Sequence, residues 1–400
     1  MAKLSVRDLN LKGKRVFLRV DFNVPLANGK VSDDTRITAS MPTIEYARKQ
    51  GARLIACSHL GRPKGKRKPD LSLKPVAARL SELIGAPVAF ADDCIGPEAE
   101  QKSAALKDGE VLLLENLRFH GEEEANDENF SRALAKLGEL YVNDAFGSAH
   151  RAHASTVGVT RFLEKSAAGF LMEKELTYLG KAVANPDHPY VAVLGGAKVS
   201  DKIEVVENLM KVADVMLVGG GMAYTFLKAK GLPVGKSLVE EDKVDLARKL
   251  LEAAVDRDFH MLLPSDHVVA EGIKTNVVTK VTTIEETPET WLGLDIGPKT
   301  VETYSAEIAK AKTVLWNGPM GVFELPPFAK GTLQIAKAVA QATAGGATTI
   351  AGGGDSVAAV QKFNLAGDIS HISTGGGASL EFLGGRKLPG VEALTDKGSG

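Results

Sequence analysis

The stretch "RVFLRVDFNVP", residues 15–25, alternates apolar side chains with others and then turns polar just before a proline. Apolar residues recur at every second position from Val16 to Val20, which predicts a β-strand. Asp21 and Asn23 follow at once, so a carboxylate and an amide stand at the tip of this strand. Asx residues also favour turns. Because ligands of open α/β sheets bind outside the carboxyl ends of the strands, the two residues also predict a binding site.

Composition indicates an ordinary globular protein of two domains. The chain has 400 residues, of which 44% are hydrophobic and 25% charged, and this length exceeds what one core usually serves. A net charge of -1 gives no overall field that would select nucleic acid or an anionic membrane. The two cysteines, Cys57 and Cys94, have no metal-ligand spacing and fit a reducing compartment. No apolar run is long enough for a membrane span, and we expect a cytoplasmic protein.

The order of apolar runs and helical patterns predicts an α/β fold. Short runs such as "EVLLLEN" and "YVAVLGG" are each followed by turn residues and then by a helical pattern, which is typical of parallel sheets with right-handed crossovers. One predicted helix, "SMPTIEYARKQG", has Ser40 as a candidate N-cap, Pro42 near its start and Gly51 past its end. We expect two Rossmann-like, doubly wound parallel-sheet domains joined by a helix, over residues 1–170, 187–379 and 171–186 respectively. We expect the closing "KGSG" to be a tail that is not part of either domain.

Cations follow the predicted strands of the first half. They stand in matching loop positions: Arg36, His59, Arg62, Arg118, His150, Arg151 and His153. Arginine presents a rigid fork that grips phosphate or carboxylate with two hydrogen bonds. Each arginine alone is also compatible with a surface ion pair, but several at one sheet edge favour a small, multiply anionic ligand.

Glycine takes the corresponding positions in the second half. The loops "LGGAKVSDK", "VGGGMAYTF", "AGGGDSVAA" and "STGGGASLEFL" each lie between an apolar run and a helical pattern. Such loops let backbone amides and a helix N-terminus approach phosphate oxygens, and four of them predict a nucleotide phosphate site. Lys202 begins a helix, where a cation opposes the helix dipole by roughly 0.3–1 kcal/mol unless a polyphosphate is bound. Asp355 is interpreted as a helix N-cap or as a partner of nucleotide-bound magnesium.

Eight motifs together resemble the phosphoglycerate kinase family, in order and spacing, from about residue 4 to residue 395. They are "RVDFNVP", "SHLGRP", "ENLRF", "NDAFGSAHRAHAS", "LGGAKVSDK", "WNGPMGVFE", "AGGGDS" and "STGGGASLEFL". The resemblance implies reversible transfer of the acyl phosphate of 1,3-bisphosphoglycerate to MgADP, giving 3-phosphoglycerate and MgATP in glycolysis. It also implies a monomer whose C-terminal segment, about residues 380–400, returns to the first domain.

The resemblance assigns roles to individual residues. The phosphoglycerate would be bound by Asp21, Asn23, Arg36, His59, Arg62, Arg118 and Arg151. The nucleotide would be bound by Lys202, Gly293 at the adenine, Glu324 at the ribose, Gly353, Gly354 and Ser356, with Asp355 positioning Mg²⁺. Ser356 stands where the family often has threonine, and it keeps the hydroxyl group.

Phosphoryl transfer depends mostly on positioning and on stabilising charge over the equatorial oxygens. We expect this charge clamp to consist of Arg36, Lys198, Lys202 and the backbone amides of Gly375 and Gly376. No general base is needed, because the acceptor carboxylate is already ionised. The ligands are predicted on different domains, so closure about the joining helix and the "STGGG" loop is expected.

Two other functions remain open at this point. Another ATP-dependent kinase of a small phosphorylated acid would need the same groups, and its products would distinguish it. A nucleic-acid-binding module could use the arginine-rich edge, but the neutral net charge and the lack of aromatic residues among the basic ones disfavour it.

Overall fold

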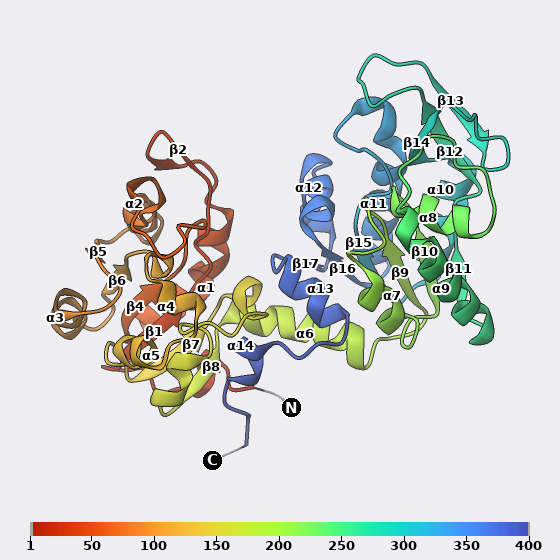
Figure 1. The fold of residues 1–400 in the computed structure, drawn as a ribbon. Coiled ribbons are helices and arrows are strands. Elements are labelled where there is room, and N and C mark those ends of the chain that lie inside the picture. Colours follow the sequence, from red (N-terminus) through yellow and green to blue (C-terminus); the bar gives the residue numbers. More distant parts are fainter. Residues whose placement is uncertain (1–2, 399–400) are drawn as a thin grey trace. The chain divides into compact units, whose positions relative to one another are not determined.

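The computed structural model describes residues 3–398, and the end of the "KGSG" tail lies outside these residues. The chain forms two compact units: residues up to 176 and from 387 onward make the first, and residues 177–386 make the second (Figure 1). The division falls within helix α6 (Phe170–Ala184). Each unit contains a six-stranded parallel sheet, which confirms the predicted α/β class. Within residues 3–398, no helix has the length and apolar character that crossing a bilayer requires.

The sheet of the first unit has the order β5-β6-β4-β1-β7-β8. Its strands are β1 (Arg15–Arg19), β4 (Arg53–Cys57), β5 (Val88–Ala91), β6 (Val111–Leu114), β7 (Leu140–Asn143) and β8 (Ser166–Ala168). A small hairpin pairs β2 (Leu26–Ala27) with β3 (Lys30–Val31). The α-helices are α1 (Thr35–Lys49), α2 (Lys74–Ile84), α3 (Pro97–Ala105), α4 (Gly121–Glu124), α5 (Glu128–Ala135) and α14 (Pro389–Glu392). Short 3₁₀ turns are η1 (Val6–Asp8), η2 (Pro69–Leu71), η3 (Leu117–Phe119), η4 (Phe146–Ser148) and η5 (Gly158–Phe162).

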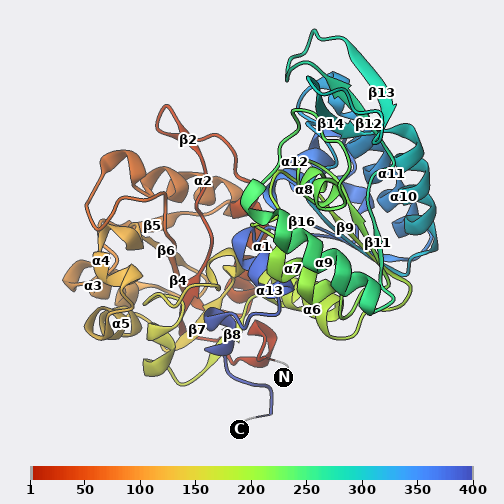
Figure 2. The ribbon, with the colours of Figure 1, turned by 45° about the vertical axis from the view of Figure 1, so that its right-hand side comes forward.

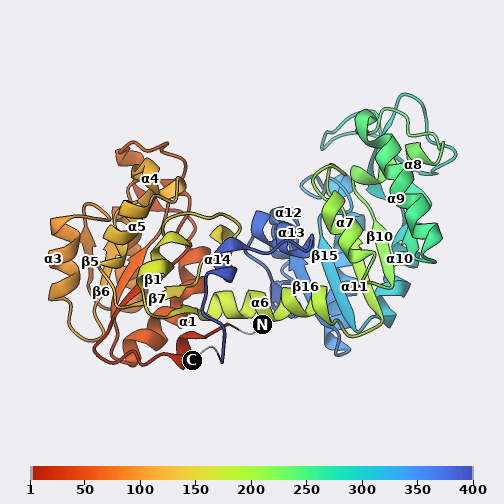
Figure 3. The same cartoon turned by 60° about the horizontal axis from the view of Figure 1, so that its bottom comes forward.

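Helices cover both faces of this sheet, with α1 on one side and α5 on the other (Figure 3). Val16 and Leu18 of β1 pack in one core cluster with Ile37 and Ile44 of α1 and Leu80 of α2. The first and last described residues lie side by side, because the Leu4 amide donates to the Thr395 carbonyl at 2.8 Å. The end of the chain therefore belongs to the first unit.

The period-two alternation in β1 does not correspond to one buried and one exposed face. β1 pairs with β4 on one side and β7 on the other, so it is a central strand. Phe17 is fully buried and stacks with Tyr141, and Arg19 is only 1% exposed. A central parallel strand is covered on both faces, and the arginine at its end is therefore a buried cation.

Helix α1 begins five residues before the predicted N-cap. Its first residue is Thr35, and Ser40 and Pro42 lie inside it, so the prediction of Ser40 as N-cap was wrong. Asp33 accepts hydrogen bonds from the amide and the hydroxyl of Thr35 and starts the helix there. The prediction of Gly51 past the end was right, since it follows the helix with a φ of 76°. The earlier start places Arg36 in the first turn.

The sheet of the second unit has the order β11-β10-β9-β15-β16-β17. Its strands are β9 (Tyr190–Leu194), β10 (Val215–Val218), β11 (His260–Leu262), β15 (Thr313–Asn317), β16 (Thr348–Gly352) and β17 (His371–Ile372). A separate antiparallel sheet joins β12 (Asp266–Ala270), β13 (Thr279–Thr283) and β14 (Leu292–Ile296). The helices are α7 (Ile203–Leu209), α8 (Met222–Ala229), α9 (Val244–Asp256), α10 (Pro298–Lys310), α11 (Lys330–Ala344), α12 (Gly354–Lys362) and α13 (Gly377–Leu383), with 3₁₀ turns η6 (Glu241–Lys243), η7 (Pro326–Phe328) and η8 (Ala366–Asp368).

Figure 2 shows α9 and α10 on opposite sides of the parallel sheet of this unit. On the side of α10, Trp316 of β15 is buried in one cluster with Tyr304 of α10 and Ile335 of α11. The strands run in parallel, so the loops after β9, β10, β15, β16 and β17 all leave the same edge of the sheet. These loops contain the glycine runs.

Candidate active site

The polar residues after β1 meet neighbouring loops at the carboxyl edge of the first sheet. Nη1 of Arg36 donates to Oδ2 of Asp21 at 2.7 Å. The amide of Gly61 donates to Oδ1 of Asn23 at 2.9 Å, and its carbonyl accepts from Nη1 of Arg118 at 3.0 Å. Asp21 also accepts the amide of Asn23, so the Asx turn is present as well. The structure thus brings Asp21, Asn23, Arg36 and Arg118 together.

Positive charge is concentrated at this edge. Burial lowers the pKa of Arg118, and the nearby charges of Arg19 and Arg151 lower it further. His59 is 7% exposed; burial lowers its pKa well below the usual range, and several arginines add to the shift. Glu124 opposes the shift of Arg118. A bound anion would favour the protonated forms of Arg118 and His59, and this edge therefore suits a multiply anionic ligand.

The other predicted cations of this edge are accessible. Arg62 and Arg151 are exposed, and the side chain of Arg36 is 41% exposed. Nε of Arg151 donates to Nε2 of His150 at 3.1 Å, while His153 is buried. Exposed arginines beside buried ones can move to a ligand, and the buried ones can hold it at the sheet edge.

Arg19 lies beneath this edge and was not predicted as a site residue. Its Nε donates to Oγ of Ser155 at 2.9 Å, and its Nη2 lies 3.1 Å from Nδ1 of His59. Oγ of Ser155 donates to Oε1 of Glu123 at 2.6 Å. Burial raises the pKa of Glu123, and Arg19 opposes that shift. The available signal was an arginine between Leu18 and Val20, near the end of a predicted strand.

Lys202 is the central cation of the second unit. It lies at the N-cap of α7 and is 9% exposed. Its Nζ donates to the carbonyl of Asn317 at 2.7 Å and also contacts Oδ1 of Asn317. Burial lowers its pKa to about 8, although Asp355 and Asp201 oppose the shift. A Cβ at Gly318 would lie 2.7 Å from this Nζ and 2.3 Å from the Gly195 carbonyl, so only glycine fits there.

The loop after β16 leads directly into α12. Gly353 is the N-cap residue with a φ of 86°, and Asp355 is the second residue of the helix. The interpretation of Asp355 as N-cap was therefore wrong: the loop needs a positive φ at the cap, which glycine supplies. The carboxylate of Asp355 is exposed. Ser356 is buried and its Oγ accepts from the Gly318 amide at a short distance, so its hydroxyl joins two loops.

The other predicted clamp residues lie in the loop of Lys202 and in one further loop. Lys198 precedes Lys202 between β9 and α7 and is exposed; this loop is held by Glu240, whose Oε2 accepts the amides of Val199 and Ser200 at 2.6 and 3.0 Å. Gly375 and Gly376 precede α13, and the Gly375 amide donates to Oγ of Ser373 at 3.3 Å. Both loops leave the same edge of the sheet.

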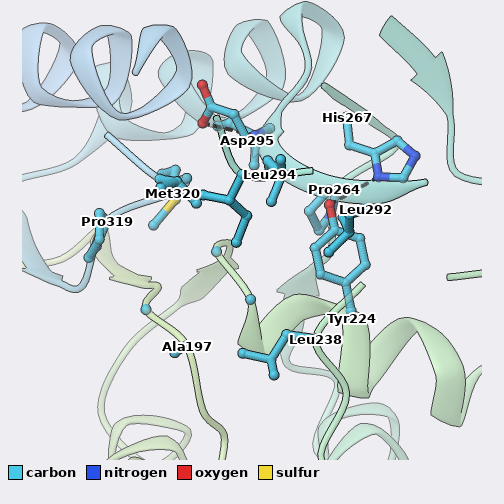
Figure 4. Close-up of a pocket in the computed structure, with 18 of the residues that line it drawn as sticks. Ala197, Tyr224, Leu238, Pro264, His267, Leu292, Leu294, Asp295, Pro319 and Met320 are labelled. Atoms are coloured by element: carbon cyan, nitrogen blue, oxygen red, sulfur yellow. Dashed lines mark hydrogen bonds between the residues drawn. The ribbon is translucent and has the colours of Figure 1, made fainter. Parts of the chain in front are cut away.

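A cavity of about 280 Å³ opens at this edge (Figure 4). Apolar side chains form most of its wall: Ala197, Leu238, Pro264, Leu292, Leu294, Pro319 and Met320. Gly293, Glu324 and Asp355, three of the predicted nucleotide contacts, also line it. A Cβ at Gly293 would lie 1.8 Å from Oη of Tyr224, so this position requires glycine. An apolar slot beside glycine loops and a lysine suits a nucleotide base next to its phosphates.

Burial shifts the pKa of two ionisable side chains in the cavity wall. Burial lowers the pKa of His267 to about 4, and the ring lies between Tyr224 and Thr287, with both hydroxyl oxygens 3.0 Å from its nitrogens. Burial raises the pKa of Asp295 to about 7, while amide donors oppose the shift. His267 is therefore neutral at neutral pH and Asp295 is only partly ionised, and the positive charge lies at Lys198 and Lys202.

A unit with a cationic ligand edge and a unit with a nucleotide-type cavity define a two-unit α/β kinase. The family model for phosphoglycerate kinase matches residues 6–386. The chain belongs to the phosphoglycerate kinase family. It is 61% identical over 405 residues to the phosphoglycerate kinase of Koribacter versatilis, covering 99% of this chain and 100% of that one. It is 59% identical over 397 residues to the enzyme of Chlorobium phaeobacteroides, with coverage of 99% and 100%.

Solved structures give the same result for the fold. The phosphoglycerate kinase of Coxiella burnetii superposes with a TM-score of 0.92 at 43% identity, and 98% of each chain is covered. The enzyme of Pyrococcus horikoshii superposes with a TM-score of 0.84 at 38% identity and the same coverage. The predictions of the family and of two parallel-sheet units are confirmed.

Proposed function

We propose that this chain catalyses the reversible transfer of the acyl phosphate of 1,3-bisphosphoglycerate to MgADP, giving 3-phosphoglycerate and MgATP. Membership of the family supports this reaction. The observation that carries the proposal furthest is Lys202, a buried ammonium whose hydrogen-bond acceptors within residues 3–398 are two oxygens of the uncharged Asn317. Asp355 and Asp201 act on Lys202 through space, but neither accepts a hydrogen bond from it in this part of the chain. A nucleotide phosphate would supply a directly bonded anion.

We expect the first unit to bind the phosphoglycerate and the second to bind the nucleotide. Asp21 and Asn23 would orient the hydroxyl and carboxyl end of phosphoglycerate, and the cations His59, Arg62, Arg118 and Arg151 would hold its anionic groups. In the second unit, Gly293 and Glu324 would face the base and ribose, and the amides of Gly353, Gly354 and Ser356 would face the phosphates. Arg36, Lys198, Lys202 and the amides of Gly375 and Gly376 would stabilise charge on the transferred group.

The residues at the start of α12 fit magnesium bound to the nucleotide. The Asp355 carboxylate is exposed and lies in the first turn of α12, near enough to Lys202 to act on it electrostatically. Hard divalent cations prefer such oxygen ligands. When bound, the ion would neutralise phosphate charge, and Asp355 would hold it beside the α12 N-terminus.

The proposal includes a cytoplasmic monomer with small-molecule partners and no nucleic acid or membrane as its primary partner. A net charge of -1 supports the last point. The two ligands would bind to separate units, and we expect the transfer to involve domain closure.

The test is ADP formation from MgATP with and without 3-phosphoglycerate, followed through reduction of the acyl phosphate. We expect rapid turnover that depends on 3-phosphoglycerate and falls sharply in Arg36→Ala. Nucleotide binding without turnover on 3-phosphoglycerate would contradict the proposal and indicate a different anionic acid.

A further inference from the structure

His59 makes a hydrogen bond whose direction is fixed by chemistry. Nη2 of Arg19 lies 3.1 Å from its Nδ1. A guanidinium can only donate, so Nδ1 must accept through its lone pair and carries no proton. A neutral imidazole whose Nδ1 accepts has its single proton on Nε2. The contact with Arg19 therefore specifies both the tautomer and the charge of His59.

Arg19 cannot easily turn away from this role. It is 1% exposed. Its Nη1 donates to the Val20 carbonyl and its Nε to Oγ of Ser155, and Nη2 itself also donates to Oγ of Ser148 at 3.4 Å. Ser155 can accept from Arg19 because its own proton is donated to Glu123 at 2.6 Å. Glu123 is fully buried and also accepts the Ser155 amide at 2.9 Å. The chain of donors from Arg19 through Ser155 to Glu123 thus has only one possible direction.

The surroundings of His59 disfavour a second proton. Positive or basic groups face it from four elements: Arg19 from β1, Arg36 from α1, Arg118 from η3, and His153 from the loop after η4. Burial lowers the pKa of His59 first, and these groups lower it further. Among the residues that face the ring, no carboxylate bonds to it; Glu123 instead lies 4.0 Å from His153.

The other ring nitrogen remains available. Within residues 3–398, Nε2 of His59 has no hydrogen-bond partner, and it is not among the fully buried atoms that lack one. This nitrogen therefore keeps some exposure and can donate to a ligand.

We propose that Arg19 is a positioning residue that fixes His59 as the neutral Nε2–H tautomer, so that His59 gives the phosphoglycerate one directed N–H donor and no positive charge. This inference rests on the proposed function for the identity of the ligand. The acceptor is an oxygen of the bound acid. The arginines compensate the negative charge of that acid, and the N–H of His59 orients the oxygen that accepts it.

The first test is the nitrogen and proton spectrum of the eight histidine side chains in the full-length, isotope-labelled protein, with His59 assigned by its loss in His59→Gln. We expect the Nε2–H pattern for His59, unchanged from pH 5.5 to pH 8. In Arg19→Met the ring should show both tautomers, while burial and the remaining arginines still hold the pKa of His59 below its usual range. The matched control Arg132→Met, which removes an exposed arginine, should leave the His59 signals unchanged. An imidazolium or an Nδ1–H pattern at pH 7 in the unaltered protein would overturn the proposal.

The second test keeps the proposal falsifiable if Arg19→Met does not fold. Glutamine places an N–H donor where Nε2 lies but cannot carry charge. We expect His59→Gln to keep the KM for 3-phosphoglycerate within about threefold, whereas His59→Leu raises it about tenfold or more, with a smaller effect on kcat. Equal damage in both variants, or no damage in His59→Leu, would overturn the donor role. If 3-phosphoglycerate does not bind the unaltered protein at all while the Nε2–H pattern holds, the proposed function fails and the positioning by Arg19 stands.

Discussion

Nucleotide binding should drive Lys202 to take up a proton. The pKa of Lys202 in the free protein is lowered by burial to about 8, so about half of these side chains are neutral at pH 8 and about a tenth at pH 7. An anion within roughly 4–6 Å raises the pKa of a cation by about 1–3 units. Binding of ADP or ATP should therefore take up close to half a proton at pH 8 and about a tenth of a proton at pH 7.

The measurement is titration calorimetry with MgADP in two buffers of different ionisation enthalpy, at pH 7 and at pH 8. The difference between buffers gives the protons taken up, and Lys202→Met should lose this uptake while retaining weaker binding. Lys337→Met, at an exposed position of α11, should behave like the unaltered protein. If no proton is taken up at pH 8, or if Lys202→Met takes up as many protons, the conclusion that Lys202 binds the nucleotide phosphates is refuted.

Three other predictions concern the first unit. Arg36→Ala should lower kcat about a hundredfold or more with nucleotide Kd changed less than about threefold, as measured by turnover and calorimetry; unchanged turnover would remove Arg36 from the clamp. Glu123→Gln should lower the free energy of unfolding by about 3 kcal/mol in a urea titration, because it leaves the buried guanidinium of Arg19 uncompensated. The control Glu128→Gln, on the exposed face of α5, should change this free energy by less than about 0.5 kcal/mol. The pKa of His120 is raised by its hydrogen bond to Asp93, so this bond stabilises the fold below pH 6.5, and the stabilisation is lost as pH rises through the folded pKa. Asp93→Asn should therefore lower the free energy of unfolding more at pH 5.5 than at pH 8.5. An equal loss at both pH values would contradict this prediction.

The sequence predicted those features that depend on short patterns. Buried runs followed by turn residues gave the parallel sheets, because a strand covered on both faces must be apolar. The tips of the strands were visible as Asp21 and Asn23 in one half and as glycine runs in the other. Right-handed crossovers then bring the tips of all strands in one sheet to the same edge. The topology alone therefore predicted that these side chains and loops lie at one site.

What the sequence did not predict depends on partners that are distant along the chain. Arg19 was not predicted as a site residue because alternation is a local signal, whereas its burial is set by the strands on both sides of β1. The start of α1 was missed because Asp33, rather than Ser40, bonds to the first turn. Asn317 could not be linked to Lys202, 115 residues away, from either segment alone.

The two units differ in how the charge of a buried cation, Arg19 in the first and Lys202 in the second, is compensated. This difference distinguishes a structural cation from one available to a ligand. Arg19 is joined through Ser155 to a fully buried carboxylate, so its charge is compensated in the folded protein without any ligand. Lys202 has only neutral oxygens as hydrogen-bond partners within the described chain, and burial shifts its pKa towards neutrality. Asp355 and Asp201 act on Lys202 through space, but a carboxylate bonded to this ammonium would compete with a phosphate for it. The lack of a bonded carboxylate within the described residues is therefore the feature that keeps Lys202 available to a nucleotide. Arg19, whose charge is compensated, can instead hold a neighbouring ring in place.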